Sequence, residues 1–533
     1  MATFSRFGSA AESALPLGAV TLVVLGLSLA GVLPEWPGLL HAVALPPFDI
    51  AFDLRVLVTR APSYSVFALG LTASVAARSL LLTWLLGALG HRGTFEERLG
   101  LALRFYLVAL VFVGAAAGLE FSALAALYHW YFWVGLGLVL LLFLLTAAAP
   151  FGGLLEGNRS LGRSFVRSAA RGFRLVTVLV YLILLAALGA LSGRLGSQTG
   201  VVLVPISALL TLVAAQRFAG APRGPKRGRT AYGFGIIALV LALLLPPAGA
   251  QTGRSSQASG EPVLFLAPGV DSASGDGTLY EFDPATIGFP CDRVYYYSYA
   301  GSGAGAPQGE ARCPIRAHSP YVREDTQRPL AELTHSFAEQ VESIRAAAGD
   351  VPLVVVTHSQ SAWIAWAAIA GGEVSGVSHL IMISGFPRNE VAYPPEGVDG
   401  IGQVGSDVLR FLSDQSREAE ISTFDPDAPL ARELMAPPGG VALLLSQPLP
   451  SDVRAMSIAA TFDAALTPGG RSLDGVVDAG TVDTTHVALV GAPETAKTIT
   501  EFLAGGEPGR VTLLAQVLDR VLPAFGVPPF ASS

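Results

Sequence analysis

Charged side chains are scarce in this chain, and the few that it has are unevenly distributed. Only 14% of the 533 residues are charged, whereas 51% are hydrophobic. Residues 1–250 carry 18 Lys plus Arg against 8 Asp plus Glu, while residues 251–533 carry 16 against 33. The acidic second half lacks the basic face that nucleic-acid binding favours, so we expect no nucleic-acid partner. The composition therefore divides the chain into a basic, apolar half and an acidic half.

Cysteine is equally scarce, because the chain has only Cys291 and Cys313, both in the acidic half. An isolated pair 22 positions apart is a credible disulfide where the compartment is oxidising. Such a bond would tie the Gly-rich stretch between the two residues to the neighbouring strand. The alternative is two free thiols, which would count against an exported second half.

Long apolar runs, by contrast, fill the first half. A hydrocarbon core of ~30 Å requires about 20 apolar residues, and we count seven candidate runs: residues 15–33, 64–86, 99–119, 124–145, 175–191, 200–215 and 231–247. We therefore predict an all-α polytopic membrane domain of about seven spans over residues 1–250. The first run is followed by six others and has no convincing cleavage site, so we interpret it as an uncleaved anchor and not as a signal peptide.

Basic residues between these runs predict their orientation, because short cytoplasmic loops collect Lys and Arg. The connection after the second run carries Arg92 and Arg98, and the connections after the fourth and sixth runs are also basic. All three lie on one side if the N-terminus is cytoplasmic, which places residue 251 onward outside. We expect a plasma-membrane protein, and the Arg-rich, Lys-poor composition favours a GC-rich bacterium as its source.

Three ionisable residues fall within or near the apolar runs: Arg78, Arg104 and His129. Such groups are costly in a membrane and are often functional. Arg104 lies near a predicted cytoplasmic end and can extend towards the interface. Arg78 lies deeper, so we expect it to make an interhelical or lipid-headgroup contact.

Strand-like and helix-like segments alternate over residues 261–505, after a Gly- and Ser-rich linker at 251–260. Strands are predicted at 263–266, 293–299, 352–356, 379–384 and 453–460, and helices at 330–348, 362–369 and 493–504. This alternation indicates a mostly parallel sheet covered on both sides. Residues 387–450 interrupt it with Pro, Gly and acidic residues, and residues 506–533 predict a terminal helix and tail.

The segment T-H-S-Q-S at residues 357–361 joins a predicted strand to a predicted helix. A serine at such a sharp turn is strained, and its hydroxyl is exposed above the sheet when the residues two before and two after it are small. Glycine is usual at those places, which Thr357 and Ser361 occupy here. Ser359 is the candidate nucleophile. If Ser361 were the nucleophile, the large Trp363 would lie two residues after it, where a small residue is needed. The alternative is an ordinary serine that caps the following helix.

Asp463 is the candidate acid, because it lies in the loop directly after the predicted strand at 453–460. Open parallel sheets carry their active sites at that edge. A carboxylate there can orient a histidine and stabilise the imidazolium that forms during catalysis. Three other aspartates compete for this role but lie in a Gly-rich approach to His486 and not directly after a predicted strand: Asp474, Asp478 and Asp483.

His486 is the candidate base, because it lies in the loop before the predicted helix at 493–504. A serine hydroxyl is a poor nucleophile at neutral pH, and a neutral imidazole can take its proton. His358 adjoins the nucleophile, and the remaining histidines of this half precede the segment or begin a strand. The alternative for His486 is a solvated surface residue.

The chain order of Ser359, Asp463 and His486 on this pattern resembles the α/β-hydrolase superfamily over roughly residues 261–505. The resemblance implies an oxyanion hole formed by the N–H of the residue after the nucleophile, Gln360, and by an N–H of the loop after an early strand, by position that of Val270. It implies no metal or organic cofactor. It also implies that the insertion at 387–450 is a lid, although a plain surface excursion would have a similar composition.

These expectations combine into a membrane-anchored serine hydrolase that cleaves an ester or related acyl bond through a covalent acyl-enzyme. A lipid, a lipidated protein or an acylated envelope component at the bilayer surface fits the short linker as substrate, and amides, thioesters and acyl transfer stay open. The altered residues at 357 and 361 favour an alternative, a non-catalytic hydrolase-like sensor or assembly protein of a membrane complex. A transporter with an outer accessory domain is a third hypothesis.

Overall fold

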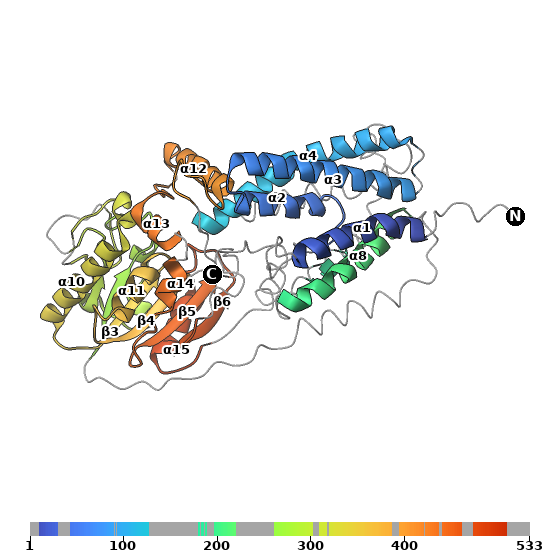
Figure 1. Ribbon diagram of the computed structural model, residues 1–533. Coiled ribbons are helices and arrows are strands. Elements are labelled where there is room, and N and C mark those ends of the chain that lie inside the picture. Colours follow the sequence, from blue (N-terminus) through green and yellow to red (C-terminus); the bar gives the residue numbers. More distant parts are fainter. Residues whose placement is uncertain are drawn as a thin grey trace.

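The molecule has two differently built parts, one of long helices and one containing a β-sheet (Figure 1). The computed structural model describes residues 10–29, 43–89, 91, 93–126, 180–181, 183–185, 187–188, 197–219, 261–301, 309–316, 319–385, 394–420, 422–435, 440–460 and 473–508. The described long helices of the first part end before residue 220, and the described strands of the second part begin after residue 260. This division agrees with the shift in composition along the chain.

The first part is built from apolar helices that pack side by side. Their bounds are α1 (Ala10–Leu29), α2 (Phe48–Arg60), α3 (Tyr64–Ala88), α4 (Phe95–Ala126) and α8 (Ser197–Ala219). The Ser63 hydroxyl accepts a hydrogen bond from the N–H of Val66 and caps the start of α3. Glu96 and Glu97 lie in the first turn of α4, where the helix dipole favours negative charge. Helices α3 and α4 follow each other closely in sequence and pack as an antiparallel pair.

The prediction of about seven membrane spans is wrong. Within the described residues, only two helices are long and apolar enough to cross a membrane: α3 over Tyr64–Ala88 and α4 over Phe95–Ala115. The predicted first and sixth spans correspond to α1 and α8, whose apolar stretches, Leu15–Leu27 and Val202–Arg217, are too short for a hydrocarbon core. These two helices pack against each other, and a count of apolar runs does not separate such packing from membrane crossing.

Several other predictions for the first half concern residues outside the described ranges. The predicted seventh span at 231–247, most of the fourth span at 124–145 and much of the fifth at 175–191 are among them. His129, the linker at 251–260 and the terminal helix are also outside these ranges.

Arg78 makes the interhelical contact expected from its sequence position. Its Nε and Nη2 donate to Oδ2 and Oδ1 of Asp53 on α2, at 2.8 Å each, and the Ser74 hydroxyl donates to the same carboxylate at 2.6 Å. A bidentate pair of this kind fixes the relative orientation of two helices as well as compensating both charges. The pair therefore fixes α2 against α3.

The second part contains a six-stranded, all-parallel sheet in the order β2-β1-β3-β4-β5-β6. The strands are β1 (Val263–Ala267), β2 (Val294–Tyr296), β3 (Leu353–His358), β4 (Val377–Ile383), β5 (Arg454–Ala460) and β6 (Val476–Val482). Every residue of β1 and of β3 is buried, so both faces of the central sheet are covered. The predicted mostly parallel α/β sheet is confirmed.

Helices connect and cover the strands. Their bounds are α10 (Leu330–Ala348), α11 (Ser361–Ala370), α12 (Gln403–Glu418), α13 (Pro429–Met435), α14 (Gly440–Leu445) and α15 (Pro493–Leu503), and the short turns are η4 (Thr278–Tyr280), η5 (Pro284–Ile287), η6 (Cys291–Arg293) and η7 (Arg323–Gln327). The helices predicted from periodicity correspond to α10, α11 and α15. Helices α12, α13 and α14 belong to the insertion between β4 and β5, whose role as a lid stays a prediction.

Strand β6 is the element that the sequence pattern missed. Its residues, V-V-D-A-G-T-V, include an aspartate and Gly480, whose φ of 81° lies in the left-handed region. The N–H of Gly480 donates to Oδ1 of Asp478 at 2.9 Å, a turn-like contact within the strand. Pairing with β5 nevertheless makes it a strand, with a register shift between Ser457 and Ala459.

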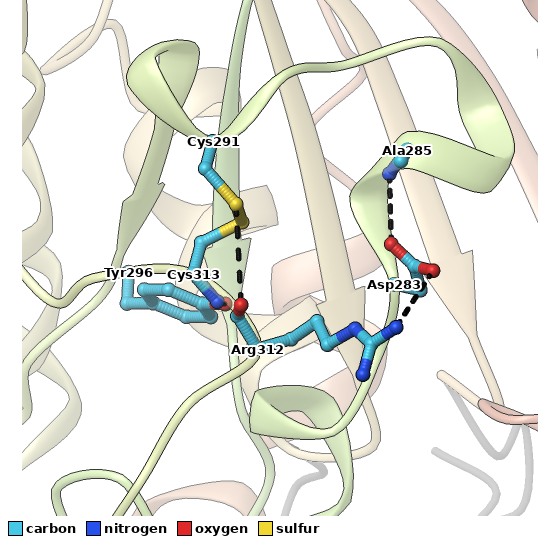
Figure 2. Close-up of a disulfide and its surroundings, with 6 residues drawn as sticks. All are labelled: Asp283, Ala285, Cys291, Tyr296, Arg312 and Cys313. Atoms are coloured by element: carbon cyan, nitrogen blue, oxygen red, sulfur yellow. Dashed lines mark hydrogen bonds and ion pairs between the residues drawn. A yellow bond between two sulfur atoms is a disulfide. The ribbon is translucent and has the colours of Figure 1, made fainter.

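Cys291 and Cys313 form a disulfide, as their isolation in the sequence predicted, with Cα atoms 5.2 Å apart (Figure 2). The N–H of Cys313 donates to the Tyr296 hydroxyl at 3.2 Å, which ties the bridge to β2. Next to it, Arg312 pairs with Asp283 at 3.4 Å. The bridge thus anchors the returning chain beside the edge strand.

We expect the disulfide to be complete in protein isolated without reductant. The denatured, unreduced chain should take up no iodoacetamide, and the reduced chain should take up two equivalents, one for each cysteine. Mass spectrometry of the alkylated chain measures both. Two alkylated cysteines before reduction would contradict the bond and would also remove its support for an oxidising location.

His379 predicts a defined pH dependence of stability. Burial, with a smaller contribution from the Arg454 charge, lowers the pKa of His379 from 6.5 to about 4. The unfolded chain therefore binds more protons than the folded chain between these values, and the free energy of unfolding falls as pH falls through this window. His379→Gln should lose less thermal stability than wild type when the pH is lowered from 7 to about 4.5. Equal losses, measured as shifts in melting temperature, would contradict this assignment.

Candidate active site

Ser359 lies in a strained turn between β3 and α11, as its position in the sequence predicted. Its φ of 58° is in the left-handed region, which costs a non-glycine residue about 1–3 kcal/mol and persists only where the surroundings enforce it. Its N–H donates to the carbonyl of Ile383 at 2.9 Å, and its own carbonyl accepts from the N–H of Ala362 at 3.1 Å. Backbone hydrogen bonds on both sides thus hold the turn.

The predicted exposure of this serine is wrong, because Ser359 is only 6% exposed. Its neighbours His358 and Gln360 are equally buried, and Ser361 is fully buried. The strand–helix turn raises the residue above the sheet, but loops from other strand ends cover it. A pattern within one segment does not report on such long-range packing.

Thr357 and Ser361, which replace the usual glycines, connect the turn to the strands on either side. The Thr357 hydroxyl donates to the carbonyl of Ile381 on β4 at 3.2 Å. The Ser361 hydroxyl donates to the carbonyl of Ala267 at the end of β1 at 2.6 Å and accepts from the N–H of His358 at 3.1 Å. Both hydroxyls therefore stabilise the turn, which explains how residues larger than glycine are accommodated.

Gly269, in the loop after β1, lies so close to the serine turn that a Cβ atom there would make unusually tight contacts. A Cβ atom at this position would lie 3.0 Å from Cβ of Ser359 and 3.1 Å from the carbonyl oxygen of His358. Such distances require the neighbouring atoms to move. Glycine thus allows the two loops to meet at the carboxyl edge of the sheet.

The loop after β1 is held by hydrogen bonds to its carbonyl groups. The Tyr299 hydroxyl donates to the carbonyl of Pro268 at 2.7 Å, and the Ser272 hydroxyl donates to that of Gly269, also at 2.7 Å. Burial raises the pKa of Tyr299 well above its ordinary value, so the phenol stays protonated and can donate. These bonds fix the loop that carries Val270.

Val270 and Gln360, the expected oxyanion-hole residues, lie on the two loops that Gly269 and Ser359 bring together. In the part of the chain that the structure describes, neither backbone N–H donates to a protein acceptor. Gln360 immediately precedes α11, where N–H groups have no partner within the helix. Two available donors beside a serine are what stabilisation of an oxyanion requires.

His486 is brought to the serine turn from the loop after β6. It is 8% exposed, and its carbonyl oxygen lies 3.3 Å from Nε2 of His358. The two imidazole rings have their centroids 5.1 Å apart. His486 is therefore buried against the residue that precedes Ser359, which is not the position of a solvated surface histidine.

His358 also lies at this site, although it was not predicted to be the base. Its Nδ1 would lie 3.2 Å from a Cβ at Gly269, and its ring faces His486. It thus lies between the loop after β1 and the loop after β6. The only signal in the sequence was its position next to the candidate nucleophile.

Asp463 is the predicted acid. Asp463 is outside the described residues, so its role stays a prediction. Asp463 was preferred because it alone directly followed a predicted strand. That distinction is wrong, because Asp483 directly follows β6. Asp463 and Asp483 thus follow β5 and β6, respectively, two adjacent strands of the sheet.

A cleft of about 750 Å³ opens beside this site. The η7 turn and the two residues before α10 form one wall, and residues 417, 420, 422, 423, 425 and 427–429 of the insertion form the other. Charged side chains of both signs line it, including Arg323, Arg417 and Asp425, whereas Ser359, Val270 and His486 do not. The cleft therefore borders the candidate site without containing its reactive groups.

No protein-family model matches this chain, and no curated protein matches it. The interpretation of the site consequently depends on its geometry. That geometry joins a strained serine, a buried histidine and two available N–H donors at one edge of a parallel sheet.

Gly269→Ala tests whether the close approach of the two loops is needed. The added methyl group should displace the serine turn and lower the rate of Ser359 modification by a fluorophosphonate at least about tenfold, or ~1.4 kcal/mol of barrier. The matched control is Gly491→Ala, because nothing lies within 4 Å of a Cβ at Gly491. Equal rates in both variants would show that the contact is unimportant for reactivity.

Proposed function

We propose that this protein is a membrane-associated serine hydrolase that cleaves an ester or related acyl bond through a covalent acyl-enzyme. The observation that carries the proposal is the left-handed backbone of Ser359 at the β3–α11 turn, with His486 buried against the adjacent His358. Six parallel strands in an order compatible with the α/β-hydrolase superfamily support it.

The proposed reaction has two steps. His486 accepts the proton of the Ser359 hydroxyl while the oxygen attacks the substrate carbonyl, and the N–H groups of Val270 and Gln360 bind the resulting oxyanion. The imidazolium then protonates the leaving alcohol, which leaves an acyl group on Ser359. Water, activated by His486, or a second alcohol in a transfer reaction then releases the acyl group. Asp463 would orient His486.

Exposed apolar side chains support association with a membrane. On α3 and α4, Leu69 is 73% exposed and Val111 is 71% exposed, and the described α1 shows Leu15 at 73%. Large exposed apolar surfaces mark membrane or protein interfaces. Because α3 and α4 are also long enough to cross a bilayer, we propose that they anchor the protein in one.

Two observations support an extracytoplasmic position for the sheet-containing part. The connection between α3 and α4 carries Arg92, with Arg98 in the first turn of α4, and basic connections favour the cytoplasm. The insertion from the second part contacts Tyr64, at the opposite end of α3. We therefore propose that the sheet lies on the other side of the membrane, where the disulfide would persist.

The position at the membrane surface favours an amphiphilic substrate. We propose an acyl ester of a lipid, a lipidated protein or an envelope component, because such a molecule can reach the site from the bilayer. The charged side chains of the cleft, among them Arg323, Arg417 and Asp425, would suit a hydrophilic portion of this substrate.

The direct test is labelling of the full-length, detergent-solubilised protein with a fluorescent fluorophosphonate. We expect labelling of the wild type and loss of the label in Ser359→Ala, because only an activated serine hydroxyl reacts. Ser384→Ala is the matched control, since Ser384 is also a buried serine with a positive φ, 47°, at the end of the adjacent strand β4. In-gel fluorescence reports both.

Retention of the label in Ser359→Ala together with its loss in Ser384→Ala would identify Ser384, at the end of β4, as the nucleophile. A folded wild type without any label would contradict the hydrolase proposal and favour a binding role for the site. Ser361→Ala is not a neutral control, because its hydroxyl holds the turn to β1.

A further inference from the structure

The insertion helix α12 packs against apolar helices of the first part, α2 and α4, which are remote from it in sequence (Figure 1). Val404 and Leu409 of α12 share a buried cluster with residues of α2 and α4: Leu54, Val58, Ala109 and Val113. Phe424, a few residues beyond α12, packs partly buried against the same cluster. We call this cluster the insertion–anchor interface.

Polar contacts fix α12 at the same place. The Tyr64 hydroxyl, at the start of α3, donates to Oδ2 of Asp407 at 2.6 Å. Oδ1 of Asp407 accepts from Nη1 of Arg410 at 2.7 Å. Arg410 also donates to both carboxylate oxygens of Asp427, at 2.7 and 3.0 Å. The guanidinium thereby connects α12 to the segment that follows Phe424.

The residue before Phe424 contacts the loop of the proposed oxyanion hole. The N–H and the hydroxyl of Thr423 both donate to Oδ1 of Asp271, at 2.9 and 2.7 Å. Asp271 directly follows Val270, and its φ is 64°. A non-glycine residue keeps this conformation only when neighbouring groups enforce it. Thr423 supplies two hydrogen bonds that do so.

Thr326 in the η7 turn joins the two oxyanion-hole segments to each other. Its hydroxyl oxygen accepts from the N–H of Asp271 at 3.3 Å, and its carbonyl accepts from the side-chain amide of Gln360. The neighbouring Gln327 donates to the carbonyl of Thr423 at 2.9 Å and accepts from the N–H of Asp425 at 2.6 Å. Both donor segments are therefore bonded to one turn, and that turn is bonded to the insertion.

From these contacts we infer that Asp271 and Thr423 are positioning residues for the oxyanion hole, and that α2, α3 and α4 of the first part hold Thr423 in place through the insertion–anchor interface. This inference rests on the proposed hydrolase function. The apolar first part would then contribute to catalysis as well as to attachment. Phe424 at the interface and Thr423 on Asp271 are adjacent residues, so the connection is short.

An oxyanion hole acts mainly on the transition state, so its misplacement lowers the rate of the chemical step more than it weakens binding. For a fluorophosphonate, the limiting rate of inactivation should fall while the half-saturating concentration stays the same. A general loss of folding would instead lower the labelled fraction. A lower limiting rate with an unchanged half-saturating concentration and an unchanged labelled fraction therefore identifies a positioning role.

The first pair of variants tests Asp271. Asp271→Ala removes the acceptor for Thr423 and should lower the limiting inactivation rate at least about tenfold. Asp271→Asn keeps an acceptor oxygen and tolerates a positive φ, so it should stay within about threefold of wild type. Equal losses in both variants would contradict the positioning role.

The second pair tests the interface from the anchor side. The double variant Val113→Ala, Leu409→Ala removes buried methyl groups from the interface and should lower the limiting rate at least about threefold. The matched control is Val111→Ala, Phe411→Ala, on the same two helices, where the wild-type side chains are 71% and 62% exposed. It should react at the wild-type rate.

The outcomes separate this inference from the proposed function. If the wild type is labelled and the interface double variant reacts at the same limiting rate, the coupling is overturned and the hydrolase proposal stands. A slower interface variant with an unchanged control supports the coupling. A wild type without label would remove both proposals.

Discussion

The left-handed backbone of Ser359 is the constraint on which the site depends. A strained residue at the junction of a strand and a helix persists only if neighbouring groups enforce it. Here the enforcing groups come from both adjacent strands: Thr357 bonds to β4 and Ser361 bonds to β1. Gly269 allows the loop after β1 to approach without a side chain. The same contacts that maintain the strain also bring the candidate oxyanion donors beside the serine.

The two parts of the chain are more closely connected than a tether would require. A helix of the insertion shares a buried cluster with α2 and α4, and a tyrosine at the start of α3 bonds to an aspartate of that helix. Phe424 packs against this cluster, and the residue before it, Thr423, donates a hydrogen bond to Asp271. Packing in the first part can therefore influence the geometry of a site on the sheet.

Local patterns in the sequence predicted those features that local physics decides. The strands β1 and β3 are continuous apolar runs because both of their faces are buried, and α10 shows its helical period because one side packs on the core. The disulfide followed from two isolated cysteines. The turn at Ser359 was predicted although neither flanking residue is glycine, since the strand and helix on either side were clear.

Features that depend on distant contacts were missed or predicted wrongly. Hydropathy overestimated the number of membrane spans, because the apolar stretches of α1 and α8 are too short to cross a hydrocarbon core. Strand β6 escaped notice because it contains Gly480 and Asp478, and only its pairing with β5 shows it to be a strand. The burial of Ser359 and the place of His358 against His486 also depend on loops that are remote in sequence.

The central claim is that His486 activates Ser359, and the rate of fluorophosphonate inactivation in His486→Ala tests it most directly. Loss of the proton acceptor should slow the reaction of Ser359 with saturating probe roughly a thousandfold, whereas the folded fraction should match wild type. His379→Ala, at a histidine on β4 whose ring packs edge-on against Phe502, serves as the comparison. An unchanged rate in His486→Ala would contradict this claim, because the serine would then react without its proposed base.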